Sequence, residues 1–159
     1  MHIVTFTALA DFPALLEAHL RAFPFDVMRS MPVDGAEAKG LRQLVVDQLV
    51  SIQAFELTFQ AQLTNTLSGE TPASFTSAAE LANTNDAVAS EPEAMLADIQ
   101  DARKRTLSIL EDLTEAQWSA AIALDGTDTT VIGLVHRLCA HDFDQLSALQ
   151  HALANCGAA

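Results

Sequence analysis

Apolar residues recur every three or four positions through most of this chain, a spacing typical of amphipathic helices. The pattern is clearest in GLRQLVVDQLVSIQAFEL (40–57) and VIGLVHRLCAHDFDQLSALQHAL (131–153). No segment shows the strict alternation of apolar and polar residues that a half-buried strand requires. The sequence therefore predicts a protein made of helices whose apolar stripes face a shared core.

Start and stop residues divide the pattern into four long helices. We expect Asp11 to cap the first, with Pro13 in its first turn, and Asp128 or Thr129 to cap the fourth. The third opens with the capping box Ser90-Glu91-Pro92-Glu93. The predicted helices cover about residues 11–23, 41–65, 91–113 and 129–155, with a short capped turn at 114–118 and a break at 124–128.

Two longer connections join these helices. Residues 24–40 contain Pro and Gly breakers, and residues 64–90 are rich in Ser, Thr, Asn, Ala and Gly, with one short helix at about 77–82. A long crossover between the second and third helices allows an arrangement that a tight turn forbids. We expect one domain over residues 1–159, an all-α four-helix bundle.

The charge balance excludes one class of partner. The chain carries 21 acidic and 8 basic residues, a formal net charge of −13, which repels a nucleic-acid backbone. Arg103, Lys104 and Arg105 are consecutive, but three neighbours on a helix point in different directions. We interpret this run as a solvated counter-charge to nearby acidic residues, namely Asp98, Asp101, Glu111 and Asp112.

Other features indicate a soluble cytoplasmic protein. The N-terminal residues lack a basic signal-peptide start, and no uncharged apolar run approaches the length of a membrane span. The two cysteines, Cys139 and Cys156, form no CxxC motif, which favours a reducing compartment. We interpret Cys139 as a small buried hydrophobic residue, His19 as a core-edge histidine bonded to a neighbour, and His136 as a residue with a surface or interhelical role.

Three polar residues lie on apolar stripes. His141 and Gln145 are spaced i, i+4 on the fourth helix, so both project from one face, as two ligands of one metal do. Gln48 lies in the middle of the second helix's apolar face. A buried amide or imidazole can equally be hydrogen-bonded within a bundle core, so a ligand role and a structural role both remain open.

These segments resemble a known family, the DinB-like or YfiT-like four-helix-bundle metalloenzymes. VIGLVHRLCAHDFDQLSAL is similar to the family's last-helix pattern of His-Asp, two residues and a second His. GLRQLVVDQLVSIQAFEL is similar to the second-helix segment that usually carries the third metal-binding His. TEAQW followed by DGTDTTVIGLV resembles the run-in to the last helix. The resemblance covers nearly the whole chain and implies the same bundle.

Carried onto this sequence, the resemblance implies a degenerate metal site. His141 matches the first His of the pair, whereas Gln145 and Gln48 stand where the other two are expected. Amides are poorer donors than imidazoles for Zn²⁺ or Ni²⁺, so we favour an emptied site with no cofactor, or one weakly bound Zn or Ni. Two alternatives remain: a site that uses His141 with Asp144 and Asp47, and a neutral hydrogen-bonded trio of His141, Gln145 and Gln48.

Two functions follow from these interpretations. The first is a metal-poor family member that serves as a stress-related module, binding a small molecule or a partner and forming a homodimer through a helix face. The alternative is a metal-dependent hydrolase or thiol transferase, as some relatives resemble, in which His141 would be the residue that carries the chemistry. We expect neither nucleic acid nor membrane as a partner.

Overall fold

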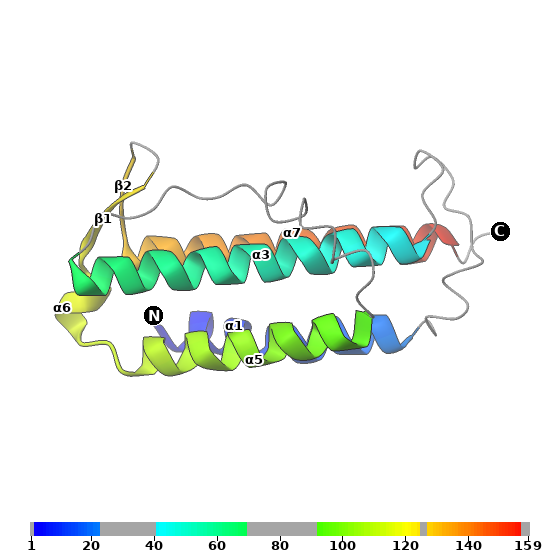
Figure 1. Ribbon diagram of the computed structural model, residues 1–159, viewed down its shortest axis with the longest axis horizontal. Helices are drawn as coiled ribbons and strands as arrows, with labels where there is room; N and C mark the ends of the chain where they lie inside the picture. The colour runs from blue at the N-terminus through cyan, green and yellow to red at the C-terminus, as the bar shows by residue number, and fades with distance from the viewer. Residues whose placement is uncertain (1, 23–40, 70–91, 125–126, 157–159) are drawn as a thin grey trace.

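The structure, a computed structural model, describes residues 2–22, 41–69, 92–124 and 127–156. Its long helices are α1 (His2–Arg21), α3 (Leu41–Ser68), α5 (Pro92–Glu111) and α7 (Val131–Cys156). They run side by side as a bundle (Figure 1), which confirms the predicted all-α fold. The connection expected at 24–40 and the short helix at 77–82 lie outside the described residues. None of the described helices is long and apolar enough to cross a membrane.

The helix directions explain the long crossover in the sequence. In Figure 1, α3 and α5 run from right to left, whereas α1 and α7 run from left to right. Each helix packs on two neighbours, α3 and α1 each contacting both α5 and α7. Because α3 and α5 are parallel, the end of α3 and the start of α5 lie at opposite ends of the bundle, which requires a long connection between them.

The core consists of two apolar clusters, one toward each end of the bundle. The first is formed by Phe12, Leu16, Leu20, Val45, Val46, Leu49, Ile52, Met95, Ile99, Leu149 and Leu153. The second is formed by Leu9, Phe59, Leu63, Leu110, Ile122, Val131, Leu134, Val135 and Leu138. On every helix the residues between the two sets, such as 53–58 on α3 and 139–148 on α7, form the middle of the bundle. The buried polar side chains Glu56, Arg103, Thr106 and Asp142 lie in this middle layer, whereas Gln62 lies beside the second cluster.

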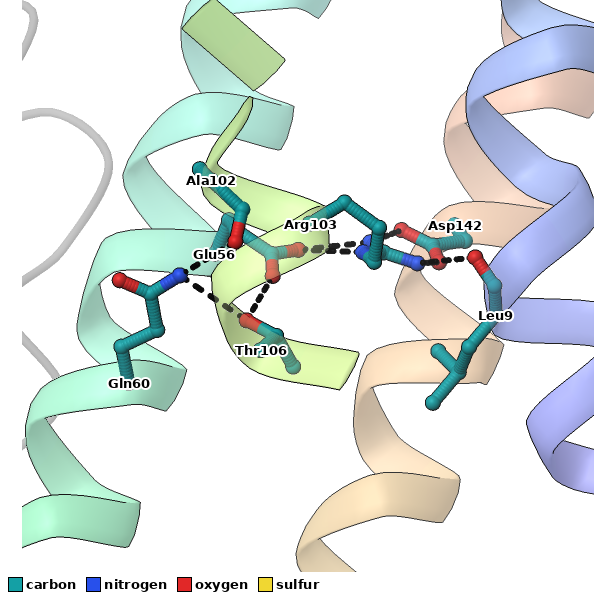
Figure 2. A network of polar contacts seen from close by, with 7 residues as sticks. All are labelled: Leu9, Glu56, Gln60, Ala102, Arg103, Thr106 and Asp142. Atoms are coloured by element: carbon teal, nitrogen blue, oxygen red, sulfur yellow. Dashed lines mark hydrogen bonds and ion pairs between the residues drawn. The ribbon is translucent and has the colours of Figure 1, made fainter. Parts of the chain in front are cut away.

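The predicted start of the first helix was wrong. Asp11 and Pro13 lie in the middle of α1, which begins at His2. Proline has no N–H, so Pro13 cannot donate to the carbonyl of Leu9, four residues earlier. That carbonyl instead accepts a hydrogen bond from Arg103 Nη1 at 3.2 Å (Figure 2). The carbonyl of Leu9 thus has a partner that is too distant in the sequence for local rules to predict.

A short capped helix and a β-hairpin cover one end of the bundle. The capped turn was predicted, and α6 (Glu115–Trp118) has a capping box between Thr114 and Gln117. The hairpin was not: β1 (Ala121–Leu124) pairs antiparallel with β2 (Thr127–Thr130), around the two residues Asp125-Gly126. Asp-Gly is a strong signal for such a tight turn, which explains the break in the helical pattern.

The fourth helix, α7, begins at Val131, so its cap is one residue later than the nearer of the two expected positions. Thr130, not Asp128 or Thr129, is the cap, because its Oγ1 accepts a bond of 3.2 Å from the backbone N–H of Gly133. A Cβ at Gly133 would lie 2.2 Å from Thr129 Oγ1, so glycine permits the chain to turn closely from β2 into α7. The predicted apolar face of α7 is buried.

Candidate functional site

A charged network occupies the centre of the middle layer. Arg103 of α5, which is 1% exposed, lies between Glu56 of α3 and Asp142 of α7. Its Nε donates to Glu56 at 2.9 Å, and its two terminal nitrogens form a bidentate pair with Asp142 at 2.7 and 3.0 Å (Figure 2). The guanidinium also lies 5.2 Å from the centre of the Phe12 ring on α1. One side chain thus links all four long helices.

Neutral groups complete this network. The hydroxyl of Thr106 donates to Glu56 and accepts from the Gln60 amide at 2.9 Å, and that amide also donates to the carbonyl of Ala102 at 2.7 Å (Figure 2). With the carbonyl of Leu9, every nitrogen of Arg103 has an acceptor. The network is therefore closed and offers no free polar atom of Arg103 to a ligand.

The interpretation of Arg103 as part of a solvated run was wrong. Lys104 behaves as expected, since it is exposed and pairs with Asp101 at 2.9 Å. Arg103 instead continues the inward stripe of α5, four residues after the buried Ile99. Burial opposes its charge, but the bond to Asp142 and the charge of Glu56 raise the pKa of Arg103 overall. Burial raises the pKa of Asp142 to about 6, and the negative charge of Glu56 adds to this rise, whereas Arg103 opposes it.

A second polar cluster lies beside the charged network, on the same turns of α3 and α7. Phe55 precedes Glu56 on α3, His141 precedes Asp142 on α7, and their rings stack with centroids 4.1 Å apart and planes 9° apart. His141 Nε2 lies 3.3 Å from the hydroxyl of Ser51 and 3.3 Å from the amide nitrogen of Gln145. The structure therefore brings Gln145 to His141, as the i, i+4 spacing predicted.

Gln48 belongs to the same seam between α3 and α7. It precedes Ser51 by one helical turn, and Gln145 follows His141 by one turn. In Figure 1, α3 and α7 run in opposite directions. A step of one turn toward the start of α3 and one toward the end of α7 therefore go the same way along the bundle from the Ser51–His141 contact, so helix geometry puts Gln48 level with Gln145. We name this group of Gln48, Ser51, His141 and Gln145 the glutamine–histidine cluster.

Unlike the charged network, the glutamine–histidine cluster is not closed. Three of its buried atoms have no hydrogen-bond partner among the described residues: Gln48 Oε1, Gln145 Oε1 and His141 Nδ1. Of the hydrogen bonds expected within the trio, the structure forms the one between Gln145 and His141. Buried polar atoms without partners cost about 1–3 kcal/mol each, so this cluster is arranged for something that supplies the missing bonds.

The imidazole of His141 is held neutral. Burial lowers its pKa to about 4, and the positive charge of Arg103 acts in the same direction, whereas the carboxylate of Asp144 acts against both. The amide nitrogen of Gln145 can only donate a hydrogen bond. With this contact, His141 Nε2 accepts, and the ring proton lies on His141 Nδ1. His141 is thus a neutral hydrogen-bonding group near pH 7.

This set of donors does not fit a tightly bound transition metal. It contains one imidazole, already bonded at Nε2, and two amide oxygens, which borderline metals disfavour. The alternative with two carboxylates fails as well. Asp144 is exposed and Asp47 bonds to Gln43 at 2.8 Å, and within the described part of the chain no three His, Cys, Asp or Glu side chains could hold a metal ion.

The remaining histidine and cysteine predictions concern positions away from this cluster. His136 is exposed, as expected. Cys139 is half-buried rather than buried, and burial raises the pKa of its thiol, so it is not an activated nucleophile. His19 contacts the carbonyl of Leu15 and the amide of Gln150, each at 2.7 Å, beside an open pocket of about 380 Å³ between α1 and α7.

The comparisons with known proteins support the bundle and are silent on chemistry. No family model and no curated protein sequence matches the chain. A solved structure does, that of YfiT from Bacillus subtilis, with a TM-score of 0.71 over 96% of this chain and 86% of that one. The chain has the YfiT fold. YfiT is described as a probable metal-dependent hydrolase with an unusual four-helix bundle topology, and at 17% identity the likeness establishes the fold alone.

Proposed function

We propose that this protein is a metal-poor bundle of the DinB/YfiT type that binds a small polar molecule at the glutamine–histidine cluster. The observation that carries the proposal is the set of three buried atoms without partners, on Gln48, His141 and Gln145. A binding site must present polar groups that the protein itself leaves unbonded, because their bonds are then made only when the ligand arrives.

The position of the cluster supports this role. It lies beside the charged network, which fixes α3, α5 and α7 relative to one another through Arg103. A binding site benefits from such support, since side chains held on rigid elements lose little freedom when a ligand binds. We therefore assign scaffolding to the charged network and binding to the glutamine–histidine cluster.

A fragment screen monitored by NMR tests the proposal. We expect small polar fragments to shift the side-chain amide signals of Gln48 and Gln145 and the ring signals of His141. The surface amide of Gln150, which bonds to His19, provides an internal control. Fragments that shift Gln150 alone, or no glutamine signal, would contradict binding at this cluster.

The alternative function is a metal-dependent hydrolase. The description of YfiT and the neutral state of His141, which leaves it able to bind a metal, favour this alternative. A metal bound there would supply an activated water. The test is esterase and amidase activity with added Zn²⁺ or Ni²⁺, which the alternative requires to disappear with a chelator and in His141→Ala.

We also propose that the protein is a cytoplasmic, stress-related homodimer. An exposed aromatic, Phe143, with 70% of its surface accessible on α7, supports a helix-mediated contact. Light scattering gives the mass in solution directly, and a Phe143→Ser variant should shift a dimer toward monomer. A protein that is monomeric at all concentrations would contradict this part of the proposal.

A further inference from the structure

The unpartnered atoms of the glutamine–histidine cluster are chiefly hydrogen-bond acceptors. Gln145 turns its amide nitrogen toward His141 Nε2, which leaves its Oε1 free, and Gln48 Oε1 is free as well. The Ser51 hydroxyl oxygen, 3.3 Å from the same imidazole nitrogen, also has lone pairs that can accept. A ligand for this seam must therefore bring several donors on one small group.

We propose that the glutamine–histidine cluster binds a primary ammonium group, and so that the ligand is a small primary amine. This inference rests on the proposed function and narrows it to one chemical class. An ammonium group presents three N–H donors from a single nitrogen, which suits two carboxamide oxygens and a hydroxyl oxygen on adjacent helices. The hydrogen on His141 Nδ1 requires an acceptor, such as a water or an oxygen beside the amine.

Burial and the charge of Arg103 disfavour a positive charge at His141, whereas the charge of Asp144 favours one. Asp144, one position before Gln145 on α7, is close enough for its charge to raise the pKa of His141. The net charge of −13 raises the local concentration of cations at the surface. Arg103 lies on the other side of these turns, where Glu56 and Asp142 compensate its charge. An ammonium group would thus meet acceptors and partial negative charge.

Three probes of nearly equal shape test this inference. They are tert-butylammonium, which has N–H donors and charge, tetramethylammonium, which has charge without donors, and tert-butanol, which has no charge. We expect tert-butylammonium to bind at least about tenfold more tightly than the other two, the effect of losing charge-assisted hydrogen bonds. Methylammonium, a smaller primary amine, serves where the branched probes are too large. Equal affinity of the two cations would overturn the inference.

Single substitutions then locate the binding. Gln48→Leu and Gln145→Leu each remove one acceptor and should each weaken tert-butylammonium or methylammonium binding by about tenfold. Gln62→Leu is the matched control, because Gln62 is a buried, unpartnered glutamine on α3 between Phe59 and Leu63 of the second apolar cluster. Ammonium binding that the first two variants leave unchanged, or that Gln62→Leu abolishes, would refute the site.

The outcomes separate this inference from the proposed function. If polar fragments without an amine shift the Gln48 and Gln145 signals and the ammonium probes do not, the binding function stands and the amine class is wrong. If neither fragments nor ammonium probes bind, both are wrong.

Discussion

Two polar clusters occupy neighbouring positions on the same turns of α3 and α7, yet they differ in how completely they are bonded. Glu56 and Asp142 meet Arg103 in a network whose nitrogens all have acceptors. His141, one residue before Asp142, stacks on Phe55 and belongs to the glutamine–histidine cluster, which has three unpartnered buried atoms. A closed network stabilises one arrangement of helices, and an open one has bonds left for another molecule. Bonding, more than burial, therefore separates scaffold from site.

The largest effect is expected on the closed network. Arg103→Met leaves two buried carboxylates without their cation, so the free energy of unfolding should fall by about 3–5 kcal/mol, measured by urea denaturation. Lys104→Met, which breaks an exposed pair with Asp101 on the same helix, is the control and should leave the urea midpoint nearly unchanged. Similar, small losses in both variants would mean that the network contributes little to the fold.

A metal can be introduced into the open cluster. Gln48→His with Gln145→His restores three imidazoles on the α3–α7 seam, so the double variant should gain Zn²⁺ or Ni²⁺ binding. At a metal concentration of about 100 Kd the gain in stability is roughly 2.7 kcal/mol, read from the rise in melting temperature. A variant that folds but gains no metal would show that Gln48 and Gln145 do not converge on His141.

A smaller gain in stability is expected when Gln62 is replaced. Its amide is 1% exposed and neither of its polar atoms has a partner among the described residues, so Gln62→Leu should raise stability by roughly 1 kcal/mol. Gln60→Leu, two positions away, removes donors to Ala102 and Thr106 and should lower it. If both variants lose stability, Gln62 has a bonding role.

The last prediction concerns pH. The folded pKa of His141, about 4, lies below the ordinary 6.5, so its contribution to stability is complete above pH 6.5 and is lost as pH falls toward 4. The raised pKa of Asp142, about 6, changes stability with pH in the opposite direction. This contribution is the same in wild type and in a His141→Gln variant. The stability difference between wild type and His141→Gln should therefore shrink from pH 7 to pH 4. An NMR titration that gives His141 a pKa near 6.5 would contradict this.

The sequence predicted the helices well because apolar periodicity depends only on local spacing. The faces of α3 and α7, the long crossover between parallel helices and the capped turn at 114–118 all follow from such signals. The hairpin was missed because each strand has only four residues, too few for alternation to stand out, although Asp125-Gly126 carried a turn signal.

The errors concern partners that lie far apart in the chain. Pro13 was placed in a first turn because Asp11 can cap a helix and proline is tolerated just after a cap. Arg103 was placed in solvent because three consecutive charged residues point in different directions around a helix. Arg103 donates to the carbonyl of Leu9, which Pro13 cannot bond, and the two residues of this hydrogen bond are 94 positions apart. Periodicity identifies which faces are buried, but the axial register that brings such atoms together depends on all four helices at once.

Metal content tests the account most directly. The protein, purified without a histidine tag or added metal, should contain far less than one Zn, Ni, Mn or Fe per chain by mass spectrometry, because one imidazole and two amide oxygens bind these ions weakly. Near-stoichiometric metal that disappears in His141→Ala would contradict the account, since it would show that the glutamine–histidine cluster is a metal centre and that its free atoms are ligands.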